Sequence, residues 1–393
     1  MGTAALDLLA QALARRRSDG LERVRRTVES AQGPRLTVDG RDLLAFASND
    51  YLGLAGAPEV IEAARDGARR YGAGAGASHL VTGHTGAHAA LEAELAAFVH
   101  PCDGARALLF SSGYLANLAI LTALAGRSDA IFGDRLNHAC LNDGALLSRA
   151  SYARYPHGDV AALESRMETA RGRRCVVATD AVFSMDGDVA PLAALAGVAS
   201  RHDAWLVVDD AHGFGVLGGG RGSLAHCGIA GERIVYMGTL GKAAGVAGAF
   251  VAAHPLVIET LVQTARPYIY TTAAPPMTIE ALRASLALIA AGDERRARLA
   301  ALVEAFRQRA ARLPWKLLPS QTPIQPLIVG DAATAVAVSG ALFARGVLVP
   351  AIRPPTVPAG TARLRISLSA AHTAGDVAVL CDALAAVARE RGA

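Results

Sequence analysis

The sequence predicts an α/β protein built on a mostly parallel β-sheet, with an N-terminal arm before it and a smaller α+β domain after it. Between residues 47 and 280, short apolar segments that suit buried strands alternate with helical stretches. Such alternation is typical of a sheet that is covered by helices on both faces. Apolar residues make up 52% of the 393 residues and charged residues only 19%. The chain therefore has ample material for a large core, and disorder is not expected to be its main state.

The N-terminal arm covers residues 1–46. Residues 1 to about 30 are expected to form an amphipathic helix with a basic face, because apolar residues at helical spacing precede a group of arginines. A turn at Gly33-Pro34 then leads into a short strand pair around Leu36 to Phe46. This segment is too small to have a core of its own.

The large domain covers residues 47–280 and the small domain residues 281–393. Strands of the large domain are expected at 107–110, 130–132, 175–179, 205–209, 234–237 and 249–252. The segment from Thr278 to Arg312 is continuously helix-forming. Beyond it, prolines separate short strands such as 327–329 and 363–368, and a last helix begins at about Ala374.

Charge and cysteine content restrict the partners and the compartment. The formal net charge is only +4, and the basic residues are scattered without a long Lys/Arg run, so nucleic acid is not an expected partner. The five cysteines are odd in number, widely spaced and without CxxC pairs, which favours reduced thiols over disulfides or a metal site. No stretch approaches 18 apolar residues. We therefore expect a cytoplasmic protein that has no membrane partner and no metal.

Lysine is rare in this chain, because Lys242 and Lys316 are the only two. Lys242 directly follows a predicted strand, in the glycine-rich segment from Met237 to Gly245. A lysine that is partly desolvated at a strand end has a lowered pKa, and its amine can attack a carbonyl carbon. The alternative interpretation is a solvated lysine in a turn.

A carboxylate and an imidazole are expected beside this lysine. Asp209 ends the apolar strand that begins at Trp205, and His212 follows three residues later. In open α/β sheets, ligands bind beyond the carboxyl ends of the strands. A carboxylate there can keep a pyridine nitrogen protonated, and an imidazole can hydrogen-bond a ring hydroxyl. Alternatively, Asp209 caps the next helix and His212 packs in the core, but together with Lys242 the cofactor interpretation is favoured.

Three further segments offer polar groups at the same edge of the sheet. Ser184 follows a third strand, and Gly113 and Tyr114 begin a helix whose backbone amides can bind a phosphate. His138 is either a surface histidine or a flat ring that stacks on an aromatic cofactor. A turn hydroxyl and an ordinary capped helix remain the alternatives for the other segments.

Two other patterns are given structural interpretations. Gly72 to Gly76 has the spacing GxGxG after an expected helix rather than a strand, so we expect a flexible turn and no dinucleotide site. His84 and His88 lie four residues apart, but Thr85 stands where a zinc protease needs Glu, so we expect a helix start.

Six ordered blocks resemble the pyridoxal-phosphate α-oxoamine synthases of aminotransferase fold type I. They span residues 48–54, 110–117, 137–139, 182–188, 208–213 and 238–242. The resemblance implies the architecture of a fold type I transferase with a seven-stranded, mostly parallel sheet. It also implies pyridoxal 5'-phosphate (PLP) as the cofactor and a homodimer with shared active sites.

The same resemblance implies roles for single residues, with Lys242, His138 and Asp209 as the catalytic ones. Lys242 would bond the cofactor aldehyde, Asp209 would face the pyridine nitrogen, and His212 would contact the ring hydroxyl. His138 would stack on the ring. The other implied cofactor contacts are Ser184, Thr239, the amides of Gly113 and Tyr114, and Thr271 and Thr272 from a second subunit.

The segment from Ala351 to Ser369 resembles the 8-amino-7-oxononanoate synthases within that family. Its prolines stiffen a loop that presents Thr356, and strand alternation places Arg363 and Arg365 on one face. One arginine could bind a substrate carboxylate through two hydrogen bonds, or both could be solvated. The resemblance selects Arg365, places Thr356 near the acyl substrate, and adds Arg23, Asn49 and His138 as substrate contacts.

The implied reaction is the decarboxylative condensation of L-alanine with a pimeloyl thioester of coenzyme A or acyl carrier protein, in biotin synthesis. Three alternatives share the cofactor residues: a glycine-using synthase (2-amino-3-ketobutyrate ligase or 5-aminolevulinate synthase), a plain aminotransferase, and a cofactor-binding protein without turnover. Two positions depart from the family pattern: His79 stands where relatives commonly have Arg or Gly, and Phe214 where many have Thr. We expect both to lie where they can tune the entrance of the site.

Overall fold

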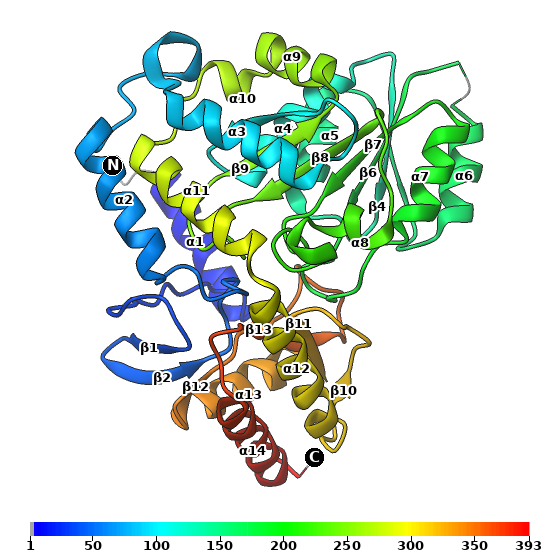
Figure 1. Cartoon of the computed structure of the whole chain (residues 1–393). Coiled ribbons are helices and arrows are strands. Elements are labelled where there is room, and N and C mark those ends of the chain that lie inside the picture. Colours follow the sequence, from blue (N-terminus) through cyan, green and yellow to red (C-terminus); the bar gives the residue numbers. More distant parts are fainter. Residues whose placement is uncertain (1–3, 171, 393) are drawn as a thin grey trace.

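The computed structural model describes residues 4–170 and 172–392, which form two lobes (Figure 1). One lobe is built on a seven-stranded sheet. Its strand order is β3 (Arg106–Phe110), β9 (Ala249–Ala253), β8 (Ile234–Thr239), β7 (Trp205–Asp209), β6 (Cys175–Asp180), β4 (Ala130–Asp134) and β5 (Ser151–Tyr155). Only β9 runs antiparallel to its neighbours within this sheet. The predicted seven-stranded, mostly parallel sheet is therefore confirmed.

Helices cover both faces of this sheet (Figure 1). Successive residues of one strand enter different cores: Val177 and Val208 belong to one apolar cluster, and Val176 and Val207 to another. Because side chains of a strand alternate between faces, two buried faces require continuous apolar strands, as the sequence has. The helices of this lobe are α2 (Pro58–Tyr71), α3 (Gly86–Val99), α4 (Gly113–Leu124), α5 (Ala139–Ser148), α6 (Val160–Glu168), α7 (Leu192–Arg201), α8 (Ser223–Cys227), α9 (Pro255–Thr264), α10 (Arg266–Ile269) and α11 (Pro276–Ala290).

The second lobe holds a four-stranded antiparallel sheet and three helices. Its strand order is β10 (Lys316–Leu317), β11 (Ile324–Gly330), β14 (Ala362–Ser367) and β13 (Ala351–Ile352). Its helices are α12 (Asp293–Ala310), α13 (Ala332–Ala344) and α14 (Ala374–Glu390). The expected strand pair of the arm is present as β1 (Arg35–Val38) and β2 (Arg41–Ala45), and β2 pairs in parallel with β12 (Val347–Leu348). The arm is thus joined to the second lobe through a shared three-stranded sheet.

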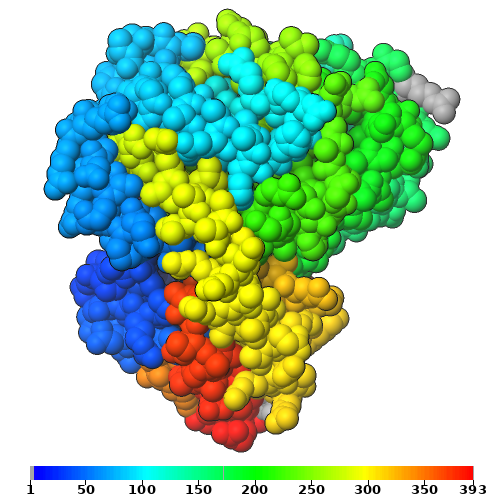
Figure 2. All heavy atoms as spheres, in the orientation of Figure 1, coloured from blue at the N-terminus to red at the C-terminus, as the bar shows by residue number. Residues whose placement is uncertain are grey.

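The expected domain boundary at residues 280/281 falls inside α11, which packs against α2 of the large lobe. In the space-filling view, the chain that runs from α11 to α12 crosses the waist between the lobes on this face (Figure 2). The division at residue 280 remains a prediction. Among the described residues, no helix is both long and apolar enough to cross a membrane.

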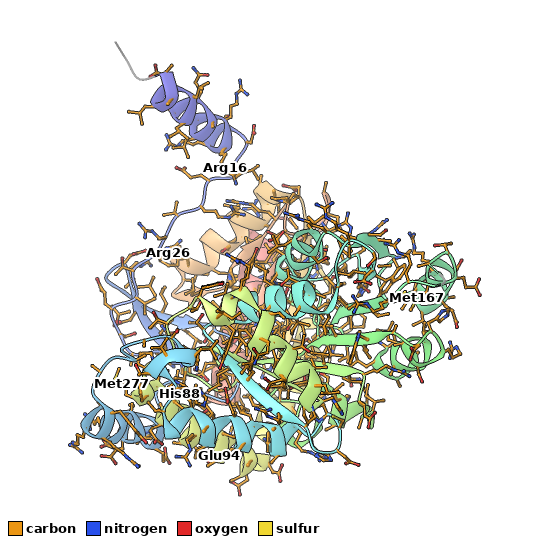
Figure 3. The ribbon with its side chains drawn as sticks, turned by 90° about the horizontal axis from the view of Figure 1, so that it is seen from above. Arg16, Arg26, His88, Glu94, Met167 and Met277 are labelled. Atoms are coloured by element: carbon orange, nitrogen blue, oxygen red, sulfur yellow. The ribbon has the colours of Figure 1, made fainter. Side chains whose placement is uncertain are left out.

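The helix expected over residues 1 to about 30 is wrong in its length. Residues 1–3 lie outside the described residues, and α1 ends at Ser18. Ser18 Oγ donates to the carbonyl of Arg15 at 2.8 Å, and Gly20 has φ +65°, a backbone conformation that ends a helix without strain because glycine has no Cβ. Every residue of α1 is exposed, so no buried apolar face forms, and the helix projects from the body of the protein (Figure 3).

The continuous helix expected from Thr278 to Arg312 is also wrong, because α11 and α12 are separated at Ala291 and Gly292. A Cβ at Gly292 would lie 2.8 Å from the carbonyl oxygen of Leu288. Glycine therefore permits a tight change of direction that the apolar periodicity alone did not reveal.

Candidate active site

A cavity of about 220 Å³ opens at the carboxyl ends of β6, β7 and β8. Its lining comes from three strand ends, the start of α4 and the start of α5. The lining residues are Gly113, Tyr114, His138, Cys140, Asp180, Ser184, Asp209, Ala211, His212, Met237, Thr239 and Lys242. The structure thus brings together most of the cofactor residues expected from the sequence, and their individual roles remain predictions.

Lys242 extends into this cavity and lies with its Nζ atom 3.0 Å from Nε2 of His212. Burial lowers the pKa of the Lys242 amine, although the nearby Asp209 carboxylate acts in the opposite direction. The turn after Lys242 is tight: Gly245 has φ +68°, and a Cβ there would lie 2.4 Å from the backbone nitrogen of Ala55. The alternative of a solvated turn lysine is therefore wrong, and the amine is held where a small carbonyl compound could reach it.

Two carboxylates stand side by side at the ends of neighbouring strands, since Asp180 and Asp209 are register partners of β6 and β7. Asp209 accepts hydrogen bonds from the side-chain amide of Asn117 at 2.6 Å and from the N–H of Ala211 at 3.0 Å. Asp180 accepts the N–H of His138 at 2.8 Å. Burial, with the Asp209 charge as a further cause, raises the pKa of Asp180 well above its usual range. The two neighbours thus have different environments, and two hydrogen bonds fix the position of the Asp209 carboxylate.

His138 caps the N-terminus of α5 and is exposed at the mouth of the cavity. Its Nδ1 accepts the N–H of Cys140 at 3.3 Å and lies 2.8 Å from the thiol of the same residue. Because Nδ1 is an acceptor, a neutral ring carries its proton on Nε2. The contacts with Cys140 thus orient the imidazole at the edge of the cavity.

His212 connects Lys242 to a buried polar chain. Its Nδ1 lies 2.7 Å from the hydroxyl oxygen of Tyr51, and this hydroxyl lies 3.1 Å from Oδ1 of Asn49. Nη1 of Arg365 donates to the same Asn49 oxygen at 3.2 Å. Burial, followed by the charge of Lys242, holds the pKa of His212 well below its usual range, so the ring is neutral at neutral pH.

The two arginines of β14 have different partners, although both are buried. Arg363 donates to the Asp186 carboxylate at 2.7 Å. Arg365 donates to the carbonyl of Ser184 at 2.6 Å and to the hydroxyl of Ser367 at 2.8 Å, and among the described residues it has no carboxylate within ion-pair distance. The alternative that both arginines are solvated is wrong. A buried guanidinium without an anion is suited to a ligand carboxylate.

The other end of the cavity lies at the start of α4. Ser112 caps this helix, and the first helical hydrogen bond there runs from the N–H of Ala116 to the Ser112 carbonyl at 3.0 Å. The amides of Gly113 and Tyr114 therefore precede the helical ladder, as phosphate-binding amides do. A Cβ at Gly113 would lie 2.7 Å from Cγ2 of Thr239, so the backbone itself forms this wall.

These donors fit the groups of PLP. An amine with a lowered pKa suits the aldehyde, a fixed carboxylate suits a protonated pyridine nitrogen, and free amides at a helix start suit the phosphate. His212, Ser184 and Thr239 border the space between them.

Besides Asn49 and Arg365, four expected site residues lie outside the lining of this cavity. Thr271 and Thr272 line a separate small cavity beside Tyr268, so the prediction that they reach a cofactor in a second subunit stays a prediction. Arg23 and Thr356 line a groove of about 720 Å³ between the arm and β13. This groove is therefore shared by Thr356, which was predicted near the acyl substrate, and Arg23, which was predicted as a substrate contact.

The two departures from the family pattern have different positions. Phe214 has 1% of its surface exposed and contacts the rings of Phe98 and Phe250, so the expectation that it tunes the entrance is wrong. His79 stacks on Tyr268 at 4.9 Å between ring centroids. It lines the cavity that holds Thr271 and Thr272.

The expected helix start at His84 to His88 is confirmed, because Thr85 caps α3 and its N–H donates to Nδ1 of His88 at 3.2 Å. His88 also donates from Nε2 to the carbonyl of Ala274 at 2.9 Å. The helix expected before Gly72 is confirmed as α2.

Four site residues were not singled out from the sequence: Tyr51, Asn117, Cys140 and Asp180. Asp180 could have been found, since it directly follows the strand predicted at 175–179. Tyr51 lies inside one of the six family blocks. Asn117 likewise ends the family block 110–117, but its contacts with Cys140 and Asp209 depend on how α4 and α5 pack.

Comparison with known proteins matches residues 41–384 to the family described as aminotransferase class I and II. The chain belongs to this family. It is 59% identical over 383 residues to the 8-amino-7-oxononanoate synthase of Nitrosospira multiformis, covering 97% of this chain and 96% of that protein. The predicted resemblance is confirmed by this and other relatives of the same name.

Two solved structures show the same architecture. A structure of SPT with PLP superposes with a TM-score of 0.92 at 29% identity and covers 99% of this chain and 98% of its own. The 8-amino-7-oxononanoate synthase of Francisella tularensis has a TM-score of 0.76 at 31% identity and covers 89% of this chain and 99% of its own. The predicted fold type is therefore confirmed.

Proposed function

We propose that this enzyme condenses L-alanine with a pimeloyl thioester and releases carbon dioxide and the carrier thiol, giving 8-amino-7-oxononanoate. The predictions of an acyltransferase and of PLP as its cofactor are confirmed by the family and its relatives. The choice of alanine and of a pimeloyl group rests on the resemblance of the segment from Ala351 to Ser369.

The observation that carries the proposal is the position of Lys242. Its amine lies in the cavity at the carboxyl ends of three strands. Nζ is 3.0 Å from Nε2 of the neutral His212 imidazole, and the Asp180 and Asp209 carboxylates line the same cavity. PLP, when bound, supplies an aldehyde for an amine and an electron-withdrawing ring that stabilises negative charge on the substrate carbon.

The residues of the chain then have distinct tasks. Lys242 Nζ removes and returns the proton of the substrate carbon, because its lowered pKa leaves it able to act as a base. Asp209 keeps the heterocyclic nitrogen protonated, and Asn117 and the Ala211 amide hold this carboxylate in place. Arg365 binds the carboxylate of alanine beside Asn49, and this places the reacting carbon toward Lys242.

The groove that Arg23 and Thr356 line favours the proposal that the acyl group arrives on a bulky carrier. Its lining includes Arg16, Arg17, Arg26 and Arg353, and this arginine-rich wall is suited to the phosphate groups that coenzyme A and acyl carrier protein both carry. The guanidinium of Arg353 donates to the carbonyl of Glu22 at 2.7 Å and ties the arm to the loop that presents Thr356.

The proposal includes a homodimer in the cytoplasm. Thr271 and Thr272 lie outside the cavity of their own chain, which supports a role in the site of a second subunit. The five cysteines are free thiols, as suits a reducing compartment.

The test is thiol release from pimeloyl thioesters with alanine, glycine or no amino acid. We expect release only with alanine and its loss in Lys242→Ala, whereas Lys316→Ala retains wild-type rates because Lys316 is exposed on β10 of the other lobe. Release with glycine but not alanine would contradict the substrate assignment. Amino-group exchange with a keto acid, without thiol release, would identify a plain aminotransferase instead.

A further inference from the structure

Tyr51 is a fully buried tyrosine at the junction of two parts of the site. It has 0% of its surface exposed. Its hydroxyl oxygen lies 2.7 Å from Nδ1 of His212 and 3.1 Å from Oδ1 of Asn49, and Nη2 of Arg365 approaches it at 3.5 Å. The phenol therefore stands between the arginine that binds a carboxylate and the imidazole that contacts Lys242.

The number of protons that can be donated limits how the hydrogen bonds can be arranged along the series from Lys242 to Asn49. Oδ1 of Asn49 can only accept, and it accepts from Arg365. The Tyr51 hydroxyl has one proton, which it can donate to Asn49 or to His212 but not to both. When the proton points to Asn49, His212 carries its own proton on Nδ1, and the lone pair of Nε2 faces Lys242. When it points to His212, the imidazole carries its proton on Nε2.

Arg365 decides between these arrangements through Asn49. As long as Arg365 donates to Asn49, that oxygen is shared between two donors. A carboxylate bound by Arg365 draws the guanidinium away from Asn49 and leaves its oxygen to the Tyr51 proton. The preference of the Tyr51 hydroxyl for donating to Asn49 or to His212 then changes. The tautomer of His212 changes with it, and so does the hydrogen bond between His212 and Lys242.

We propose that Tyr51 is a positioning residue that couples carboxylate binding at Arg365 to the state of the His212–Lys242 pair. The inference rests on the proposed function, because it uses Arg365 as the carboxylate site and Lys242 as the cofactor-bonding amine. It adds that substrate recognition and the reacting nitrogen are linked by the hydroxyl of Tyr51, a residue that does not line the cavity.

Other charged and titratable groups also face the pair. They are Asp180 and Asp209 from the strand ends, His138 and Cys140 from the start of α5, and Arg365 itself. A carboxylate at Arg365 also acts on the pair directly by neutralising its charge. Replacing Tyr51 by Phe removes the hydroxyl and leaves every one of these groups in place, so the variant separates the two effects.

The experiment uses the PLP-loaded enzyme and propionate, which is alanine without its amino group. The absorbance of the bound cofactor is titrated with pH, with and without saturating propionate. In the wild type we expect propionate to move the titration midpoint by about 0.5 to 1 pH unit, the size of one altered buried hydrogen bond. In Tyr51→Phe we expect less than half of this shift, while competition with alanine shows that propionate still binds.

Tyr236→Phe is the matched control. Tyr236 is also fully buried, and its hydroxyl donates to the Asp210 carboxylate at 2.9 Å, outside the chain of contacts that starts at Lys242. We expect its propionate shift to equal that of the wild type. A full shift in Tyr51→Phe, or no shift in a wild type that binds propionate, would overturn the coupling.

A second variant covers the case in which Tyr51→Phe does not fold or retain PLP. Asn49→Ala removes the acceptor that competes for the Tyr51 proton, so the propionate shift should again fall by more than half; an unchanged shift would overturn the proposal. Failure of the proposed function looks different. In that case the wild type shows no titrating absorbance that depends on Lys242, whatever the state of Tyr51.

Discussion

Arg363 and Arg365 lie two residues apart on β14 and are equally buried, with 4% and 6% of their surfaces exposed. The charge of Arg363 is paired with Asp186, whereas Arg365 contacts neutral oxygens. We therefore predict that replacement by Gln has different consequences at the two positions: Arg365→Gln weakens alanine binding, and Arg363→Gln weakens the fold.

The magnitudes follow from the contacts. A charge-assisted hydrogen bond contributes about 1.5 to 3 kcal/mol, so loss of Arg365 should raise the KM for alanine about 10- to 150-fold. Its effect on the free energy of unfolding should be about 1 kcal/mol or less, because an unpaired buried charge is removed with its hydrogen bonds. Arg363→Gln leaves Asp186 without its partner. Since the Asp186 side chain is 26% exposed and partly rehydrates, we expect a loss of about 1 to 3 kcal/mol in stability.

The assay is thiol release at varied alanine and saturating thioester, combined with urea unfolding of the same preparations. Arg363→Gln should keep a KM for alanine within about twofold of wild type, well below the effect of one lost charge-assisted bond. If both variants raise this KM equally, or if only Arg363→Gln does so, the assignment of the carboxylate site to Arg365 is refuted.

Two further predictions concern the phosphate end and the pH dependence of stability. Gly113→Ala should weaken PLP binding about tenfold or more in equilibrium dialysis, because its Cβ would lie 2.7 Å from Thr239 Cγ2; Gly340→Ala, in open space on α13, should instead stabilise the fold by about 0.5 to 1 kcal/mol. Hydrogen bonds to two aspartates raise the pKa of His157 to about 10. Its folded pKa is thus above the unfolded value of about 6.5, so this stabilisation is complete below that pH and is lost as the pH rises toward 10. The stability difference between wild type and His157→Gln should shrink over this window; a constant difference would count against it.

The parallel sheet could be predicted because its central strands have two buried faces. Such strands are continuously apolar, as in Trp205–Asp209, and they end in the polar residues that ligands contact. The edge strand β5 (Ser151–Tyr155) was not delimited, because most of its residues are partly or fully exposed and two of them are polar or charged. Buried strands, including the edge strand β3, are thus recognisable from composition, whereas an exposed edge strand such as β5 depends on pairing with a neighbour.

Helix ends and long-range contacts were the parts that the sequence could not supply. The break at Gly292 needs a residue without a Cβ, because a Cβ there would lie 2.8 Å from the carbonyl oxygen of Leu288, and the end of α1 depends on the left-handed backbone at Gly20. The contacts that lead from Lys242 to Tyr51 join Lys242 to His212, 30 positions apart in sequence, and His212 to Tyr51, 161 positions apart. No periodicity or local motif encodes such a contact, since it arises only when segments that are distant in sequence fold against each other.

The central claim is that the amine of Lys242 is the group that bonds PLP. Borohydride reduction of the PLP-loaded protein fixes the cofactor to that amine, and peptide mapping then identifies the labelled lysine. We expect the label on the peptide that contains Lys242. Label on Lys316, or a protein that binds PLP without any fixed label, would contradict it.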